Sequence, residues 1–471
     1  MHTCPPSAFL RHVAPLLEAT VTSLKARYDY ISVLGTDSIG MNYSASAGEL
    51  RAGDSSWIER GFVFRAQKSG VIVERAFNGL PPGDSLADTV ADALDALFST
   101  ANAATHYPAL PDEKARAEYF GTAKIEPFSA DPDLMLAKLA AARDALLAVS
   151  PEIVYAAARA EFMQVAKLFI SPERRLEQSF YWAQGYLVGV AKRGELTRED
   201  YQSFSGLKGA ELADEVLPAV PAFANELLEL LDAGSIEPGE YEVIMDPDVT
   251  GTLAHEAFGH GVETDMFVKG RAKAPAYLGK PVASPIVQMF DGAAAAAHCG
   301  SYLFDDEGRL ATATQIIKDG ILLAGISDLQ SALILGSAPT GNGRRQAYDH
   351  KAYARMTNTY IASGSDSYTD MLASVKHGWL LQKMNSGMED PKNWGIQLVV
   401  LLGREIVDGA LSGRVVSPVV CSGYVPEVLS NISMISKDFE LSGSGYCGKG
   451  YKEYVKVSAG GPYVKTRMRL G

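Results

Sequence analysis

The chain has 471 residues, of which 43 are Lys or Arg and 56 are Asp or Glu, which gives a formal charge of −13. Apolar residues make up 47% and charged residues 21%. This composition excludes intrinsic disorder, a collagen-like repeat and a disulfide-rich secreted module. The length predicts two or three domains. The acidic balance argues against a general affinity for nucleic acid or anionic membrane.

The cysteine content and the apolar runs indicate the compartment. Four cysteines in a chain of this length do not make a disulfide framework. The N-terminus has no basic region followed by an apolar run, and stretches such as 398–402 are too short to span a bilayer. We therefore expect a reducing, cytoplasmic setting without membrane association, where a cysteine is more often a ligand, a nucleophile or a small core residue.

The first half of the sequence predicts helices alternating with short strands. Apolar spacing favours helices at 8–27, 133–149 and 211–231, and Ser85 is the expected cap of another that reaches about 98. Alternating or apolar runs predict strands at 28–34, 41–46, 60–66, 71–76, 153–158, 165–170, 179–182 and 186–191, with a hairpin turn at 68–70. Four prolines mark 102–132 as a connector between two sub-parts.

Glycines and prolines near residue 236 predict the main boundary, between a domain at 1–236 and a second at 237–471. The second domain opens with a strand at 241–245 and a helix from about 250. Short strands with Gly-rich turns are expected at 311–318, 321–323, 359–361, 395–404, 405–407 and 414–417, with helices near 370–376 and 422–435. The predicted fold class is α+β: an N-terminal antiparallel sheet with helices, then a sheet-rich C-terminal domain.

A possible metal motif lies at the predicted helix of the second domain. Residues 255–260 read His-Glu-Ala-Phe-Gly-His, an H-E-x-x-x-H pattern one residue longer than the zincin H-E-x-x-H. Two imidazoles can hold zinc, and the adjacent Glu256 can take a proton from water at the metal. The plainer interpretation is that His255 and His260 flank a helix end and bond to carbonyls.

The spacing of the two histidines conflicts with an ideal helix. Residues i and i+5 lie about 140° apart on the helix surface, so His255 and His260 could not readily meet one ion. A single wider, π-type turn would bring them together, and Gly259 is where it would cost least. We therefore predict an irregular turn between Ala257 and Gly261.

A third ligand has to come from elsewhere in the chain. Glu263 and Asp265 are the local candidates. Cys447 is the distant candidate, in a loop with four glycines that permits close backbone approach. Cys299 and Cys421 lie in no such loop and are better interpreted as core residues.

These motifs resemble the TldD/PmbA (TldD/TldE) family of zinc metallopeptidases. The resemblance rests on 255–265, on Cys447-Gly448-Lys449 and on the segment 355–361 that follows the Gly-rich 341–345. It covers nearly the whole chain in element order. After Cys-Gly-Lys the family carries a Gln that this chain lacks; residues 450–453 read Gly-Tyr-Lys-Glu instead, which predicts a different substrate-side loop.

The resemblance implies an active, TldD-like zinc peptidase that acts on extended or unfolded peptides. It assigns Zn²⁺ to His255, His260 and Cys447, and the catalytic base to Glu256. It also implies a dimer, with a TldE/PmbA-like paralogue or with itself. On this basis Glu263 and Asp265 are expected to orient a histidine rather than to bind zinc.

Roles for three further residues are open at the sequence level. Tyr446, or a backbone N–H of the glycine loop, could stabilise the oxyanion. Arg355 and Asn358 could contact substrate backbone, or else cap a strand and form a structural ion pair. Two other functions compete with a peptidase: a zinc amidohydrolase of a small peptide-like product, and a non-catalytic binding subunit. A nucleic-acid-binding role has no basic, aromatic cluster to support it.

Overall fold

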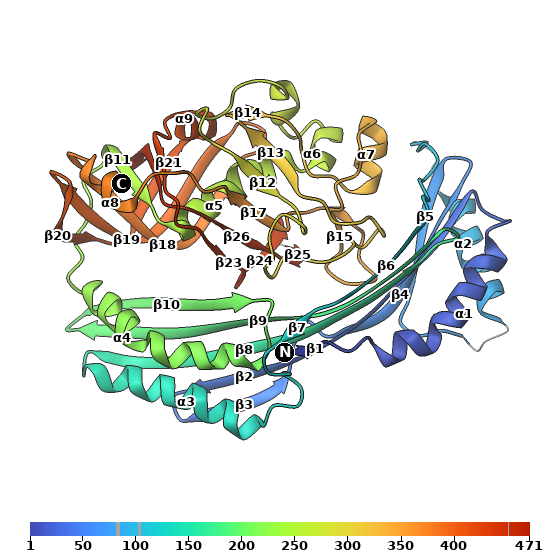
Figure 1. Cartoon of the computed structure of the whole chain (residues 1–471), viewed down its shortest axis with the longest axis horizontal. Helices are drawn as coiled ribbons and strands as arrows, with labels where there is room; N and C mark the ends of the chain where they lie inside the picture. The colour runs from blue at the N-terminus through green and yellow to red at the C-terminus, as the bar shows by residue number, and fades with distance from the viewer. Residues whose placement is uncertain (82–84, 102–104, 451) are drawn as a thin grey trace.

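The computed structural model describes residues 1–81, 85–101, 105–450 and 452–471. Its N-terminal part is built on one sheet whose main strands run in the order β10-β9-β8-β2-β4-β5, with β3 paired to β2 and β6 paired to β9. These strands are β2 (Tyr30–Ser46), β3 (Glu49–Asp54), β4 (Glu59–Lys68), β5 (Val71–Phe77), β6 (Ala115–Phe120), β8 (Ile153–Ile170), β9 (Arg174–Arg193) and β10 (Leu196–Gly206). Figure 1 shows the long strands running the length of the molecule beneath the C-terminal elements.

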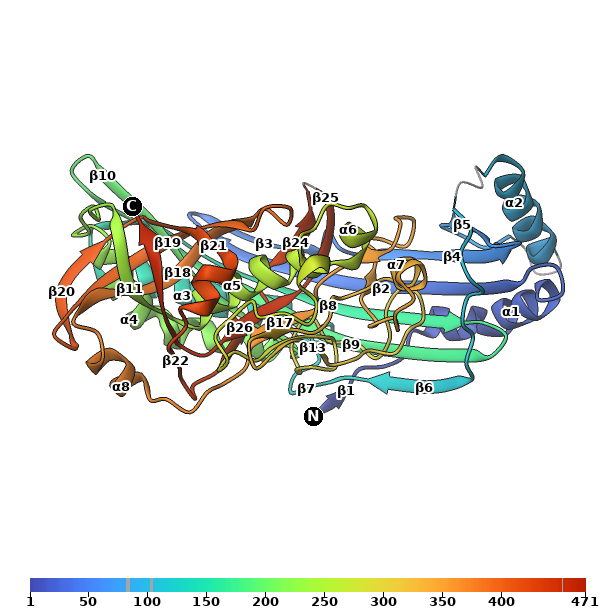
Figure 2. The same cartoon turned by 90° about the horizontal axis from the view of Figure 1, so that it is seen from above.

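Helices cover both ends of this sheet. At one end α1 (Ala8–Leu24) and α2 (Leu86–Thr100) pack on the strands and form a core with side chains such as Phe62 and Phe64. At the other end α3 (Pro132–Val149) and α4 (Ala213–Glu229) form a separate core with side chains such as Phe162 and Leu187. Figure 2 shows the two helix pairs far apart along the long axis. The short strands β1 (His2–Thr3) and β7 (Thr122–Ala123) pair with each other.

The C-terminal part contains two larger sheets. One has seven strands, of which six follow the order β11-β18-β19-β21-β27-β22 while β20 pairs with β19; the other has six, in the order β14-β13-β12-β17-β26-β23. The first comprises β11 (Gly239–Met245), β18 (His377–Glu389), β19 (Gly395–Val407), β20 (Ala410–Val416), β21 (Val419–Tyr424), β22 (Met434–Ile435) and β27 (Val464–Leu470). The second comprises β12 (Met289–Asp291), β13 (Thr314–Lys318), β14 (Ile321–Leu322), β17 (Asn358–Ile361), β23 (Glu440–Ser442) and β26 (Ser458–Gly461).

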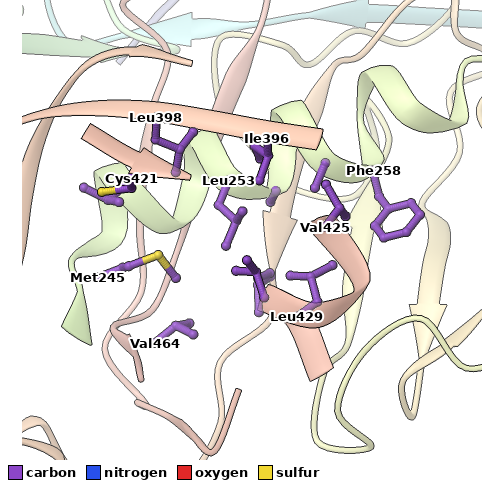
Figure 3. Close-up of a cluster of buried hydrophobic side chains, with 14 of the residues drawn as sticks. Met245, Leu253, Phe258, Ile396, Leu398, Cys421, Val425, Leu429 and Val464 are labelled. Atoms are coloured by element: carbon purple, nitrogen blue, oxygen red, sulfur yellow. The ribbon is translucent and has the colours of Figure 1, made fainter. Parts of the chain in front are cut away.

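The helix α5 (Pro247–Phe258) contacts strands of both C-terminal sheets, and its apolar face lies in the largest core of the protein. Figure 3 shows part of this core. Leu253 and Phe258 of the helix belong to the same cluster as side chains of β19 and α9 (Val425–Ser430), namely Ile396, Leu398, Val425 and Leu429. The remaining short elements are α6 (Thr264–Val268), α7 (Leu329–Leu335), α8 (Tyr368–Ala373), β15 (Gly343–Arg344), β16 (Tyr353–Ala354), β24 (Tyr446–Lys449) and β25 (Lys452–Lys456), with 3-10 turns at 210–212, 260–262 and 274–277.

The α+β class is confirmed, with sheets in both halves, but the predicted strands are too short. The separate strands expected at 28–34 and 41–46 are one strand, β2, and the four expected between 153 and 191 are two, β8 and β9. Polar residues lie between the segments that were expected as separate strands. In the structure these residues have partners on neighbouring elements. Asp37, for example, pairs with Arg60 of β4 at 2.8 Å and accepts a hydrogen bond from Ser7.

Other corrections concern the connector, the helix expected at 422–435, and the strands β10 and β18, which were not predicted. The stretch at 102–132 includes β6 and β7 as well as loop, and its residues 102–104 lie outside the described part. β18 has a polar second half without clear alternation, so we missed it. The helix expected at 422–435 is shorter, since β21 ends at Tyr424 and β22 begins at Met434. None of the described helices is both long and apolar enough to cross a membrane. The four cysteines are buried and free.

Candidate metal centre

The helix α5 begins and is held in place by features of its own sequence. Asp246 follows β11 and caps the helix, accepting a hydrogen bond from the Val249 N–H at 2.9 Å, and Pro247 occupies the first turn. Gly251 lets the helix lie against β26, because a Cβ at this position would come within 2.4 Å of the Gly460 nitrogen. The helix therefore presents His255 and Glu256 at a fixed depth beside the second C-terminal sheet.

The structure contains the irregular turn that the histidine spacing predicts. The Gly259 N–H is shared between the Ala254 carbonyl, an i to i−5 bond of the π type, and the His255 carbonyl, and a 3-10 turn starts at His260. A Cβ at residue 259 would lie 2.2 Å from the His255 carbonyl oxygen, so a side chain cannot be accommodated here. The turn brings the two imidazole rings to a centroid distance of 5.2 Å.

Cys447 of β24 completes a three-residue group with the two histidines. Its Sγ lies 3.2 Å from Nε2 of His255 and 3.2 Å from Nε2 of His260. All three atoms lie within 4.8 Å of one another. Nitrogen and sulfur ligands of a tetrahedral zinc lie roughly 3.3–3.6 Å apart, given Zn–N and Zn–S bonds of about 2.0–2.3 Å. The spacing and the donor set of two imidazoles and one thiolate therefore fit zinc.

The charges in this group favour a thiolate. Burial alone would raise the pKa of the Cys447 thiol, but the charges and hydrogen bonds of His255 and His260 outweigh burial and hold this pKa well below its usual range. Burial likewise opposes protonation of both histidines, and the nearby sulfur raises the pKa of each. A thiolate is the form of cysteine that binds a metal ion.

A network of buried charges supports the group on one side. Glu263 accepts a hydrogen bond from Nδ1 of His260 at 3.4 Å and pairs with Lys449 at 2.8 Å and with Arg355 at 3.1 Å. Burial opposes ionisation of Glu263, yet Lys449, His260 and Arg355 hold the pKa of its carboxyl well below the usual range. Asp265 contacts Lys449 at 2.9 Å and Lys269 at 2.8 Å. Glu263 thus touches a histidine, whereas Asp265 is linked to the group through Lys449.

The group opens onto a cavity of about 710 Å³ between α5, the end of β18 and the loop that carries Cys447. Glu256 lines this cavity together with His255 and His260. Within the described part of the chain, Glu256 forms no ion pair with a basic side chain, whereas Glu263 in the same wall is paired twice. The carboxylate beside the first histidine is therefore free to act on a molecule in the cavity.

The structure adds one acidic residue that the sequence gave no reason to select. Glu389, at the end of β18, lines the same cavity, and both of its carboxylate oxygens are buried without a hydrogen-bond partner among the described residues. Burial raises the pKa of Glu389 to about 9. Glu389 follows no motif and lies in a strand that was not predicted, so only the fold brings it to the cavity.

Two of the three residues with open roles lie away from the cavity. Arg355 and Asn358 are fully buried, and neither lines the cavity, so a contact with substrate is not supported for either. Asn358 donates to the carbonyls of Gly292 and Ala296, at 3.2 Å each, and acts as a structural residue. Arg355 meets Cys447 and Glu263 instead.

Tyr446 does line the cavity, but its ring is packed between side chains of both halves of the chain. The ring stacks on Trp57 at a centroid distance of 4.1 Å, and the Lys456 ammonium lies 4.6 Å from its centre. Burial first, and then the charge of Glu161, raise the pKa of the Tyr446 hydroxyl well above its usual range. That hydroxyl is therefore near Glu161 of β8. This position does not favour a role as oxyanion donor, and Tyr451 of the changed loop lies outside the described residues.

Comparison with known proteins shows which domain carries these residues. Residues 238–469 match the family model described as the PmbA/TldA metallopeptidase C-terminal domain. A metalloprotease of a Synechocystis species is 35% identical over 310 residues, which is 64% of this chain and 65% of that relative. A zinc metalloprotease TldD homologue of Saccharolobus solfataricus is 31% identical over 60% of this chain and 64% of its own length. The chain thus aligns with slightly less than two thirds of the length of these relatives.

The fold comparison extends over the rest of the chain. The TldE structure from Thermococcus kodakarensis superposes with a TM-score of 0.77 and covers 97% of this chain and 100% of its own, at 15% identity, which shows a shared fold. The fold agrees with that of TldE, and the names of the relatives agree with a metallopeptidase domain in the C-terminal half. Residues 238–469 thus carry a domain of the PmbA/TldA metallopeptidase type, and several of the curated relatives are named TldD homologues.

Proposed function

We propose that this chain is a zinc-dependent peptidase that hydrolyses extended or unfolded peptides. The observation that carries the proposal is the convergence of His255, His260 and Cys447 beside the unpaired carboxylate of Glu256, at the wall of one cavity. When bound, zinc would supply Lewis-acid polarisation of a peptide carbonyl and lower the pKa of water at the site. The other chemistry is assigned to the protein's own residues.

Glu256 is the proposed general base. Its carboxylate would accept a proton from the attacking water and later deliver that proton to the leaving amine. Glu263 is paired with Lys449 and Arg355 and so is a poorer candidate, because its carboxylate is already stabilised as an anion. His255, His260 and Cys447 would hold the metal, and Glu263 would orient His260.

The cavity supports a peptide substrate better than a small amide. Its volume of about 710 Å³ would hold either ligand, so the support comes from the strand at its wall. Residues 385–388 of β18 lie along its wall. In the described part of the chain, this end of β18 pairs only with β19, so one backbone edge is open to an extended peptide. Likeness to a TldE structure and to TldD homologues supports a dimer with a TldE/PmbA-like paralogue, or with a second copy.

A hydrolysis assay with the Glu256→Gln variant tests the proposal. The zinc-loaded protein, alone and with a TldE-like paralogue, is incubated with a library of unfolded peptides and with small N-acyl amides. We expect peptide cleavage that falls roughly 10²–10⁴-fold in Glu256→Gln while bound zinc is unchanged. Glu199→Gln, at an exposed carboxylate of β10, is the control and should cleave normally. Wild-type activity in Glu256→Gln, or cleavage of the small amides alone, would contradict the proposal.

A further inference from the structure

Arg355 joins two parts of the candidate metal centre that are distant in sequence. Its side chain is fully buried, directly after the short strand β16. Nη2 donates to the Cys447 Sγ at 3.0 Å and to the Cys447 carbonyl at 2.8 Å, and Nε donates to Glu263 at 3.1 Å. Nη1 donates to the Glu453 carbonyl. One guanidinium therefore contacts a candidate ligand and the carboxylate that holds His260.

This arrangement differs from an ordinary structural ion pair. In an ordinary ion pair, Glu263 would balance the charge of the buried guanidinium. Here Lys449 already pairs with the same carboxylate. Nη2 of Arg355 also donates to the Cys447 sulfur. An ion pair with Glu263 alone would not require this bond. Hydrogen bonds from a cation to an anionic acceptor are the strong kind, and the planar fork of Arg fixes two acceptors in one geometry.

We propose that Arg355 is a positioning residue for the metal ligand Cys447. Its guanidinium fixes the Sγ at the position where the two imidazoles converge, and it withdraws electron density from the sulfur. Through Glu263 it also holds the orientation of His260. The inference rests on the metal-binding part of the proposed function and is independent of peptide cleavage.

Cobalt substitution gives a readout that a merely structural role would not change. In the Co²⁺-loaded full chain, the energy of the sulfur-to-cobalt charge-transfer band reports how strongly the thiolate donates. Zinc affinity, measured by competition with a chromophoric chelator, is the second readout. Arg355→Gln and Arg355→Lys are compared with Arg65→Gln, which removes another buried arginine that pairs with Glu74 and Glu307.

In Arg355→Gln we expect zinc binding to weaken about 10–100-fold and the charge-transfer band to move to lower energy. Arg355→Lys, which keeps the charge but not the fork, should give a smaller shift of the same sign. Arg65→Gln should keep the wild-type band. A wild-type band in both Arg355 variants, or an equal shift in Arg65→Gln, would overturn the proposal. If Arg355→Gln does not fold, the charge-transfer band of Arg355→Lys alone tests the proposal. Since neither readout uses a peptide, failure of the peptidase assay would leave this result interpretable.

Discussion

Gly387 of β18 lies directly against Glu256 of α5, since a Cβ built on this glycine would come within 2.9 Å of Glu256 Cγ. β18 forms one wall of the cavity and therefore also restricts the position of Glu256, the proposed base. Only a residue without a side chain leaves the Glu256 carboxylate its present position. The contact joins β18, which the sequence did not predict, to Glu256 of the H-E-x-x-x-H motif.

Gly387→Ala is expected to displace Glu256 while leaving the metal ligands in place. A misplacement of about 1 Å at a reacting group costs roughly 10²-fold in rate, so we expect peptide hydrolysis to fall about 10–100-fold with unchanged zinc content. Gly395→Ala is the matched control, because a Cβ at the start of β19 meets nothing within 4 Å. Equal activity of the two variants would show that β18 does not position the base.

The cap of the metal-site helix predicts a pH dependence of stability. Burial first, and then the charge of Asp248, raise the pKa of Asp246 to about 7. The folded state therefore holds a proton that the unfolded chain releases near pH 4. The stability that this proton contributes is complete below about pH 4 and is lost as pH rises towards 7. From pH 5.5 to 7, the loss from this one group is about 2 kcal/mol.

Asp246→Asn removes the titrating group and keeps an oxygen that can accept from the Val249 N–H. Denaturant unfolding of both proteins at pH 5.5 and pH 8.0 measures the effect. We expect the free energy of unfolding of the wild type to fall relative to that of Asp246→Asn as pH rises. A constant difference between the two proteins would contradict the raised pKa.

Removal of the metal should destabilise the fold around α5 and β24. Ligand binding to the folded state alone stabilises by about 2.7 kcal/mol when the free ligand is at 100 times Kd. We expect Tm to drop by a few degrees in a strong chelator and to recover when Zn²⁺ is added in excess. Scanning calorimetry of the same sample in both conditions is the measurement. A Tm that is unchanged by the chelator and by added zinc would indicate that no metal binds at this site.

The sequence predicted the local chemistry better than the long-range geometry. The H-E-x-x-x-H spacing required an irregular turn, and the Gly259 N–H does bond to Ala254. The helix bounds in the N-terminal half were close because apolar spacing and capping residues act within one element. The strands were cut too short because their polar residues are satisfied by neighbouring strands, as Asp37 is by Arg60. Pairing partners of that kind are not visible in a single segment.

The supporting residues show the same limit. Glu263 is three residues from His260, so its contact with that ring could be anticipated. Arg355 and Glu389 could not be placed, because the positions of both depend on β16 and β18 folding back beside α5. A buried arginine and a substrate-binding arginine look alike in sequence, and only the burial of Arg355 separates them.

The central claim is that Cys447 binds a metal ion together with His255 and His260, and its most direct test is metal analysis of two cysteine variants. Wild type, Cys447→Ala and Cys421→Ala are dialysed against the same limiting free zinc, and bound metal is measured by elemental analysis. Cys421 is buried in the same core but lies in β21, outside the candidate site. We predict about one zinc per chain in wild type and in Cys421→Ala, and loss of most of it in Cys447→Ala. Full zinc occupancy in Cys447→Ala would contradict the account.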